Sequence, residues 1–129
     1  MKYVLSAILF FLCINYSYAG DVYFCSEDQS IGYAPSEAYK EKSFIEKRFK
    51  AYIDFGSEEF ESEKIWFRNE DKVECIFDKY SQSLYCISDF GSAISINKES
   101  LRFHLSSIYN SGSNQTDDIS LSYGSCEKF

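Results

Sequence analysis

The chain has 129 residues, 45% of them apolar, with 20 acidic against 13 basic side chains. This length suits one domain that buries a modest core. The net charge of −7 disfavours nucleic acid and anionic membrane surfaces as partners, because their phosphates would be repelled.

The N-terminal segment, residues 1–19, is predicted to be a cleaved signal peptide. Lys2 supplies the positive start, and Val4 to Ile14 is a mostly apolar run. That run is shorter than the about 20 residues that span a bilayer. Small side chains at Ser17 and Ala19 place the cut after Ala19.

Cleavage would leave Gly20 to Phe129 as a single exported β domain, periplasmic or extracellular. Without Lys2 the basic residues number 13 − 1 = 12, and the net charge becomes 12 − 20 = −8. The alternative, a lipoprotein acylated at Cys13, is less favoured because Leu12 stands where a small residue is wanted. No second apolar stretch reaches spanning length, so membrane insertion is not expected.

The cysteines that remain after cleavage are Cys25, Cys75, Cys86 and Cys126. An even number in a small exported chain predicts two disulfides, with three possible connectivities. If Asp78 pairs with Ser83 across a four-residue loop, the same register sets Cys75 opposite Cys86. That leaves Cys25 to join the first strand to the last through Cys126. A metal site is disfavoured, because no cysteine pair has zinc-knuckle spacing and there is one histidine.

About eight strands are expected from the alternation of apolar and polar residues. In chain order they are residues 22–25, 49–55, 65–67, 73–77, 84–87, 93–97, 101–109 and 118–126. Between them, 26–35 is interpreted as a turn-rich connection, 36–48 as irregular or briefly helical, 56–64 as an acidic loop and 110–118 as a polar loop.

Consecutive strands with short loops predict an all-β antiparallel meander. A bridge between the first and last strands predicts that the sheet closes into a small barrel or strongly curls, which also removes its free edges. Gly124 is expected to free the backbone near this closure, and Asn97-Lys98 to mark a hairpin turn.

Aromatic residues are the main excess in the composition. Those assigned inward, to the core, are Phe24, Phe49, Phe55, Phe103 and Tyr123. Exposed aromatics could stack on a sugar or anchor a protein partner. The candidate contact residues, from outward strand positions, a strand end and the last polar loop, are Tyr52, Trp66, Tyr85, His104, Ser111, Gly112, Ser113 and Asn114.

Catalytic patterns are missing from the sequence. His104 alternates with the inward Leu101, Phe103 and Leu105, so it is expected on the outer surface and not as a general base. There is no Gly-x-Ser-x-Gly motif and no glycine-rich phosphate loop. We therefore expect no catalytic residue, no cofactor and no metal.

Several short motifs carry a resemblance: Tyr23-x-Cys25, Gly32-Tyr33, Ile96-Asn97-Lys98 with Arg102-Phe103, and Gly124-x-Cys126-x-x-Phe129. Together they resemble a loose group of small exported proteins from bacteria and phages. That resemblance implies an exported chain with a structural Cys126 and implies no activity. Ser111-Gly112-Ser113 is also similar to the inhibitory loop of small-barrel periplasmic lysozyme inhibitors, whose downstream Trp and Lys-Gly pattern this chain lacks.

The function expected from the sequence is a non-enzymatic, monomeric binding or interaction module with an unidentified protein or glycan partner. One alternative is inhibition of a cationic wall-degrading enzyme such as lysozyme, which the −8 charge would favour. A second is a hydrolase that uses scattered carboxylates, for which Glu59 and Asp89 are arbitrary examples.

Overall fold

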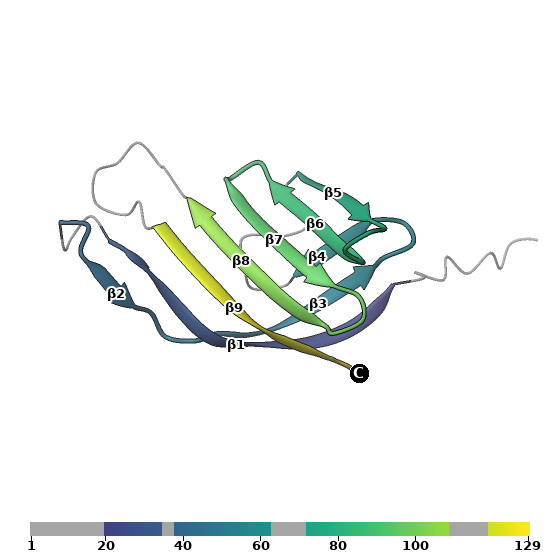
Figure 1. Cartoon of the computed structure of the whole chain (residues 1–129), viewed down its shortest axis with the longest axis horizontal. Coiled ribbons are helices and arrows are strands. Elements are labelled where there is room, and N and C mark those ends of the chain that lie inside the picture. The colour runs from purple at the N-terminus through teal and green to yellow at the C-terminus, as the bar shows by residue number, and fades with distance from the viewer. Residues whose placement is uncertain (1–19, 35–37, 63–71, 109–118) are drawn as a thin grey trace, which may run out of the picture.

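A computed structural model describes residues 20–34, 38–62, 72–108 and 119–129. These stretches form nine antiparallel β-strands (Figure 1). The described residues contain no helix, and therefore no helix long and apolar enough to cross a membrane. The all-β prediction is confirmed. In chain order the strands are β1 (Asp21–Tyr33), β2 (Glu41–Ser43), β3 (Arg48–Asp54), β4 (Glu59–Ser62), β5 (Val73–Asp78), β6 (Ser83–Ser88), β7 (Ser92–Asn97), β8 (Arg102–Ile108) and β9 (Ile119–Lys128).

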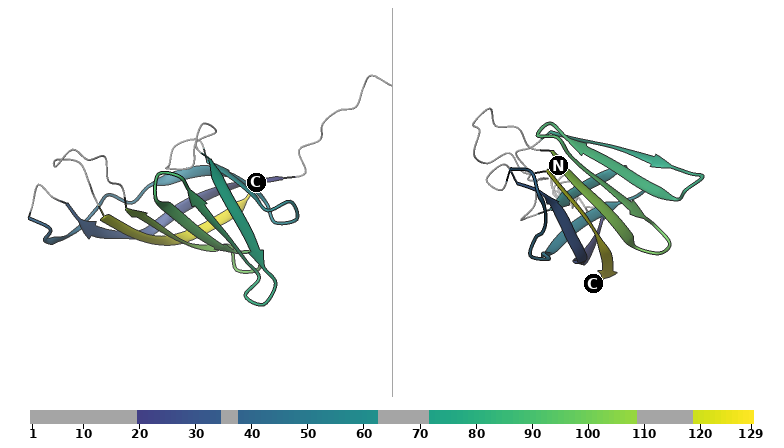
Figure 2. Two further views of the ribbon diagram at one scale, coloured as in Figure 1. Left: turned by 90° about the horizontal axis from the view of Figure 1, so that it is seen from above. Right: turned by 60° about the vertical axis from the view of Figure 1, so that its left-hand side comes forward.

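The sheet is a nearly closed barrel with the strand order β4-β3-β1-β9-β8-β7-β6-β5, and the short β2 pairs with the end of β1. Two further views show β5 to β8 on one side of the molecule, across the core from β1 and β3 (Figure 2). From β5 to β9 each strand pairs with its neighbour along the chain, as a meander does.

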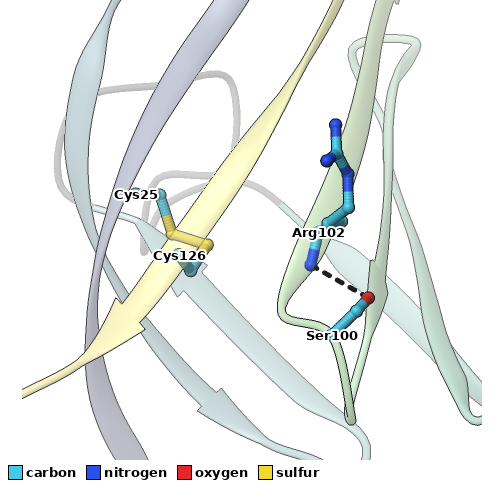
Figure 3. The surroundings of a disulfide bond; sticks show 4 residues. All are labelled: Cys25, Ser100, Arg102 and Cys126. Atoms are coloured by element: carbon cyan, nitrogen blue, oxygen red, sulfur yellow. Dashed lines mark hydrogen bonds between the residues drawn. A yellow bond between two sulfur atoms is a disulfide. The ribbon is translucent and has the colours of Figure 1, made fainter.

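The first and last long strands close the sheet, as predicted. β1 and β9 pair from Tyr23–Lys128 to Tyr33–Ile119, and within this ladder Cys25 lies directly opposite Cys126. Their disulfide links the two strands on the core side (Figure 3). The second predicted disulfide, Cys75–Cys86, is also confirmed, in the register that pairs Asp78 with Ser83.

The remaining gap in the barrel lies between β4 and β5, which no ladder joins in the described part of the chain. Side chains close it instead. The backbone N–H of Phe77 on β5 donates to the carboxylate of Glu58, next to β4, at 3.1 Å. The rings of Phe55 and Phe77 pack edge to face, with centroids 6.1 Å apart. The strand predicted at 65–67 lies outside the described residues.

The core fills the barrel with inward side chains from both halves of the sheet. Phe103 on β8 meets Phe49 on β3 edge to face, with centroids 5.4 Å apart. Phe49, Ala51 and Ile53 are buried as their alternation predicted, and the partly buried Phe55 packs against them.

Two aromatic residues assigned to the core are in fact exposed. Tyr123 points outward, because the buried Cys126 fixes the parity of β9 and turns Ser122 and Gly124 inward instead. A Cβ on Gly124 would lie 2.0 Å from the carbonyl oxygen of Ser26, so only glycine lets β1 approach β9 here. The second residue is Phe24, which lies on the outer surface. Its ring packs against the ring of Phe129, with centroids 5.5 Å apart.

β1 is much longer than the predicted strand 22–25, and the turn-rich connection predicted at 26–35 was wrong for residues 26–33, which are strand. The strand runs to Tyr33 because a bulge between Glu27 and Gln29 bends it. The buried Glu27 carboxylate accepts hydrogen bonds from the Ser122 hydroxyl at 2.7 Å and the Lys47 backbone N–H at 2.8 Å. Because the carboxylate is hydrogen-bonded, Glu27 can point to the inner face of the sheet, and the polar part of β1 continues as a strand.

Two other segments that were not predicted as strands contain one: 36–48, expected to be irregular or briefly helical, and the acidic loop 56–64. Within 36–48 the described residues form no helix but do form β2, which pairs with Ile31 to Tyr33 of β1. Within the acidic segment 56–64, residues Glu59–Ser62 form β4, whose Phe60 and Ser62 face the core. Both errors arose because these short strands carry charged outward side chains that look like loop residues.

The predicted turn at Asn97-Lys98 is confirmed. The Asn97 side-chain carbonyl accepts hydrogen bonds from the backbone N–H groups of Glu99, at 3.0 Å, and Ser100, at 2.8 Å. Its amide donates to the carbonyl of Ser81 in the neighbouring hairpin turn at 2.8 Å. Asn97 therefore ties two adjacent turns together and has a structural role.

Candidate binding groove on the outer sheet face

The outer face of the barrel carries a groove of about 930 Å³. It lies over six neighbouring strands, β5, β6, β7, β8, β9 and β1, and outward side chains line it. Because side chains of directly paired residues share one face of a sheet, the strand registers fix which of them lie side by side.

Two rows of paired residues cross these strands. The first row, from β5 to β1, is Ile76, Tyr85, Ser95, His104, Tyr123 and Gln29. The second row is Glu74, Ile87, Ala93, Ser106, Leu121 and Ile31. The second row has large side chains at both ends and the small Ala93 and Ser106 in the middle. In the first row the middle holds the small Ser95 and the larger, exposed His104.

The groove is largely apolar and open to solvent. Ile76 is 69% exposed, Ile87 56% and Leu121 55%. On the same outer face, beyond the second row, Ile108 pairs with Ile119, which pairs with Tyr33, and all three are exposed. A contiguous apolar surface of this kind is uncommon on a monomeric protein and is typical of a binding surface.

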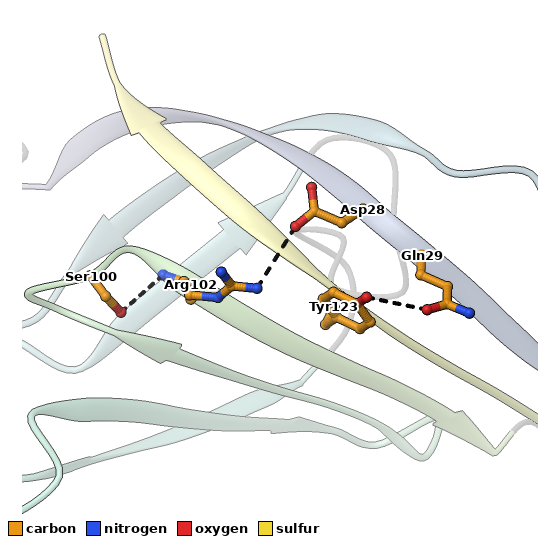
Figure 4. Close-up of polar contacts among 5 residues, drawn as sticks. All are labelled: Asp28, Gln29, Ser100, Arg102 and Tyr123. Carbon is orange, nitrogen blue, oxygen red and sulfur yellow. Dashed lines mark hydrogen bonds and ion pairs between the residues drawn. The ribbon is translucent and has the colours of Figure 1, made fainter.

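Two tyrosines on opposite flanks are held by hydrogen bonds at their hydroxyl groups. The Tyr123 hydroxyl donates to the side-chain oxygen of Gln29 on β1 at 3.2 Å (Figure 4). The Tyr85 hydroxyl lies 3.3 Å from the hydroxyl of Ser81 in the turn before β6. These hydrogen bonds restrain both rings before a ligand arrives, which reduces the entropy lost on binding.

Ion pairs flank the groove on two sides. At the β5 flank, the Lys72 ammonium lies 2.9 Å from a Glu74 carboxylate oxygen, and this hydrogen bond raises the pKa of Lys72 above its usual value. On the other side, Arg102 on β8 reaches across β9 to Asp28 on β1, at 3.8 Å (Figure 4). Both pairs are exposed and contribute little to stability.

The predicted contact residues separate into three groups. Tyr85 and His104 lie in the first row of the groove, with Ser95 between them. Tyr52 is outward on β3, where the Lys50 ammonium lies 5.2 Å from its ring centroid, and it does not line the groove. The others, Trp66, Ser111, Gly112, Ser113 and Asn114, lie outside the described residues.

Most of the groove was missed from the sequence. Ile76, Ile87 and Leu121 were assigned no contact role, and Tyr123 was placed in the core. One signal was present in the segment Leu84 to Ile87, where the residues that point to either face of the strand are apolar or aromatic. A strand with two apolar faces is expected to be covered on both faces.

The hydrolase alternative needs two carboxylates in one site. Among the described lining residues of the groove Glu74 is the single carboxylate, so the pair that a glycosidase-type hydrolase needs is not present there. The described residues also contain no cluster of three or more metal-ligating side chains.

No family model, no curated protein and no solved structure matches this chain. The geometry of the groove is therefore the basis for assigning a function.

Proposed function

We propose that the protein is an exported, non-enzymatic binding module that docks a partner protein in the groove on its outer sheet face. The observation that carries this proposal is the groove itself. Its apolar rows stay exposed even though the barrel has a separate core on its inner face. Those exposed rows contribute nothing to the core, and their burial against a partner would be favourable.

Two features support export. Both disulfides are compatible with an oxidising environment outside the cytosol. The predicted cut after Ala19 would leave every described strand whole, because β1 begins at Asp21.

A matched set of immobilised proteins tests the proposal. Each would be exposed to exported proteins from the source cells, and bound proteins would be quantified by mass spectrometry. The Ala93→Arg variant places a large charged side chain on the groove floor. The Tyr52→Ser variant changes an exposed strand tyrosine outside the groove.

We expect at least one protein to bind the wild type and Tyr52→Ser equally and to be depleted about tenfold on Ala93→Arg. Thermal unfolding of each variant checks that the fold is kept. Identical captures on all three proteins, or no capture above background, would overturn the proposal.

A further inference from the structure

The groove has a floor and two walls that run parallel to the strands. Its floor on β7 and β8 is formed by the small side chains of Ala93, Ser95 and Ser106 and by the exposed His104, which lies beside Ser95. One wall is Tyr85 and Ile87 on β6, and the other is Leu121 and Tyr123 on β9.

The distance between the walls suits a helix. At the second row, where the small Ala93 and Ser106 lie between Ile87 and Leu121, β6 and β9 are three strand spacings apart, which is about 14 Å between backbones. An α-helix with its side chains is about 10–12 Å across, whereas a single extended chain or an acyl chain would leave much of the width unfilled.

Backbone hydrogen bonding also favours a helix. The strands under the groove, β6, β7, β8 and β9, are paired on both sides, so their N–H and C=O groups are used within the sheet. An extended peptide lying on this face would find few partners for its own backbone groups. A helix satisfies those groups internally and presents only side chains.

Charge selects the chemistry of the partner. The described lining contains Glu74 and neither lysine nor arginine, on a chain whose net charge is −7. The flanking cations Lys72 and Arg102 already face Glu74 and Asp28. Because these local charges are paired, the net charge of −7 is what attracts a cationic partner and repels an anionic lipid or an acidic helix.

We infer that the groove receives an amphipathic helix of a cationic protein, which lies along β7 with its apolar face on the floor. Its lysine or arginine side chains point away from the floor, toward solvent. This inference rests on the proposed binding role of the groove and specifies the shape and charge of the partner.

Three synthetic peptides of about 14 residues, or about 20 Å as a helix, test this inference. The first contains leucine and lysine with leucines at helical spacing. The second has the same composition in strict alternation, which suits an extended strand. The third keeps helical spacing but replaces lysine with glutamate. Titration of isotope-labelled protein, followed by its amide chemical shifts, gives affinity and location, and circular dichroism reports helix formation.

The first peptide should bind and become helical, with shifts concentrated on β6 to β9. The other two should bind at least about tenfold more weakly. Added salt should reduce the difference in affinity between the first peptide and the glutamate peptide, because it screens charge. Leu121→Ser and Ala93→Arg should each lower the affinity for the first peptide by about tenfold, and Tyr52→Ser should leave that affinity unchanged. A first peptide that binds no more tightly than either of the other two, or shifts away from the groove, would overturn the inference.

The outcomes separate this inference from the proposed function. If the alternating peptide or a fatty-acid probe binds best and Ala93→Arg blocks it, the helix is refuted while the groove remains a binding site. If the protein alone forms a dimer that Ala93→Arg dissociates, the occupant is a second copy and the inference is refuted. If no probe binds, and the wild type and Ala93→Arg capture the same proteins in the same amounts, both proposals fail.

Discussion

Replacement of both Cys25 and Cys126 with alanine is expected to lower the free energy of unfolding by about 4.7 kcal/mol, if the disulfide acts by restricting the entropy of the unfolded chain. The effect is large because the two residues are 101 positions apart, so the bridge closes a loop that contains most of the domain. It also holds the β1–β9 ladder that closes the barrel. Urea unfolding followed by tryptophan fluorescence or circular dichroism measures the change.

The Cys75–Cys86 bridge provides a matched control. Its cysteines are only 11 positions apart, and the same dependence on loop length gives about 2.8 kcal/mol for the double alanine variant. The closure role assigned to Cys25–Cys126 predicts that the first double variant is clearly the less stable. An equal or larger loss from the hairpin bridge would contradict that role.

Phe103→Ala is expected to cost about 3–5 kcal/mol, the usual range for removing a buried phenylalanine ring. Phe103 is fully buried on β8 and packs against Phe49 from the opposite side of the barrel. Its loss would leave a cavity at the contact between the two halves of the sheet. Thermal and urea unfolding report the change.

Leu121→Ala is the control for that substitution. Leu121 is apolar and lies on the next strand, but it faces the groove and is 55% exposed. Its truncation should cost less than about 1 kcal/mol, as exposed substitutions usually do. A loss of stability as large as that of Phe103→Ala would mean that Leu121 belongs to the core. It would refute the assignment of a buried inner face and an exposed outer face to the sheet.

Local patterns predicted much of the fold. The alternation in 49–55 and 101–105 indicated the correct inward residues, because those strands carry one apolar and one polar face. The four-residue loop between Asp78 and Ser83 indicated the register of the disulfide hairpin. The Cys25–Cys126 pairing then indicated which strands close the sheet.

The same alternation failed on β9. Ile119, Leu121 and Tyr123 form the apolar set, yet they face outward, because the disulfide commits Cys126 and its even-numbered neighbours to the inside. The choice of face there depends on a covalent bond to a strand 101 positions away and not on hydrophobicity. The conflict was visible in the sequence, since Tyr123 and Cys126 cannot share a face of a regular strand.

The groove could not be assembled from the sequence, because it depends on the registers of six strands at once. Its floor consists of small residues such as Ala93 and Ser95, which carry no signal of their own. Only their position between the large side chains on β6 and β9 makes them a floor. Tyr85 and His104 were predicted as contacts on exposure alone, and the registers place them in one row.

The most direct test of the groove compares two strand tyrosines of similar exposure, Tyr85 at 48% and Tyr52 at 37%. The dissociation constant of a protein captured by the wild type would be measured by calorimetry against Tyr85→Ser and Tyr52→Ser. If the groove is the binding site, Tyr85→Ser weakens binding by about tenfold or more and Tyr52→Ser changes it by less than about twofold. Equal effects of the two substitutions, or a larger effect of Tyr52→Ser, would contradict the assignment of binding to the outer face of β6 to β9.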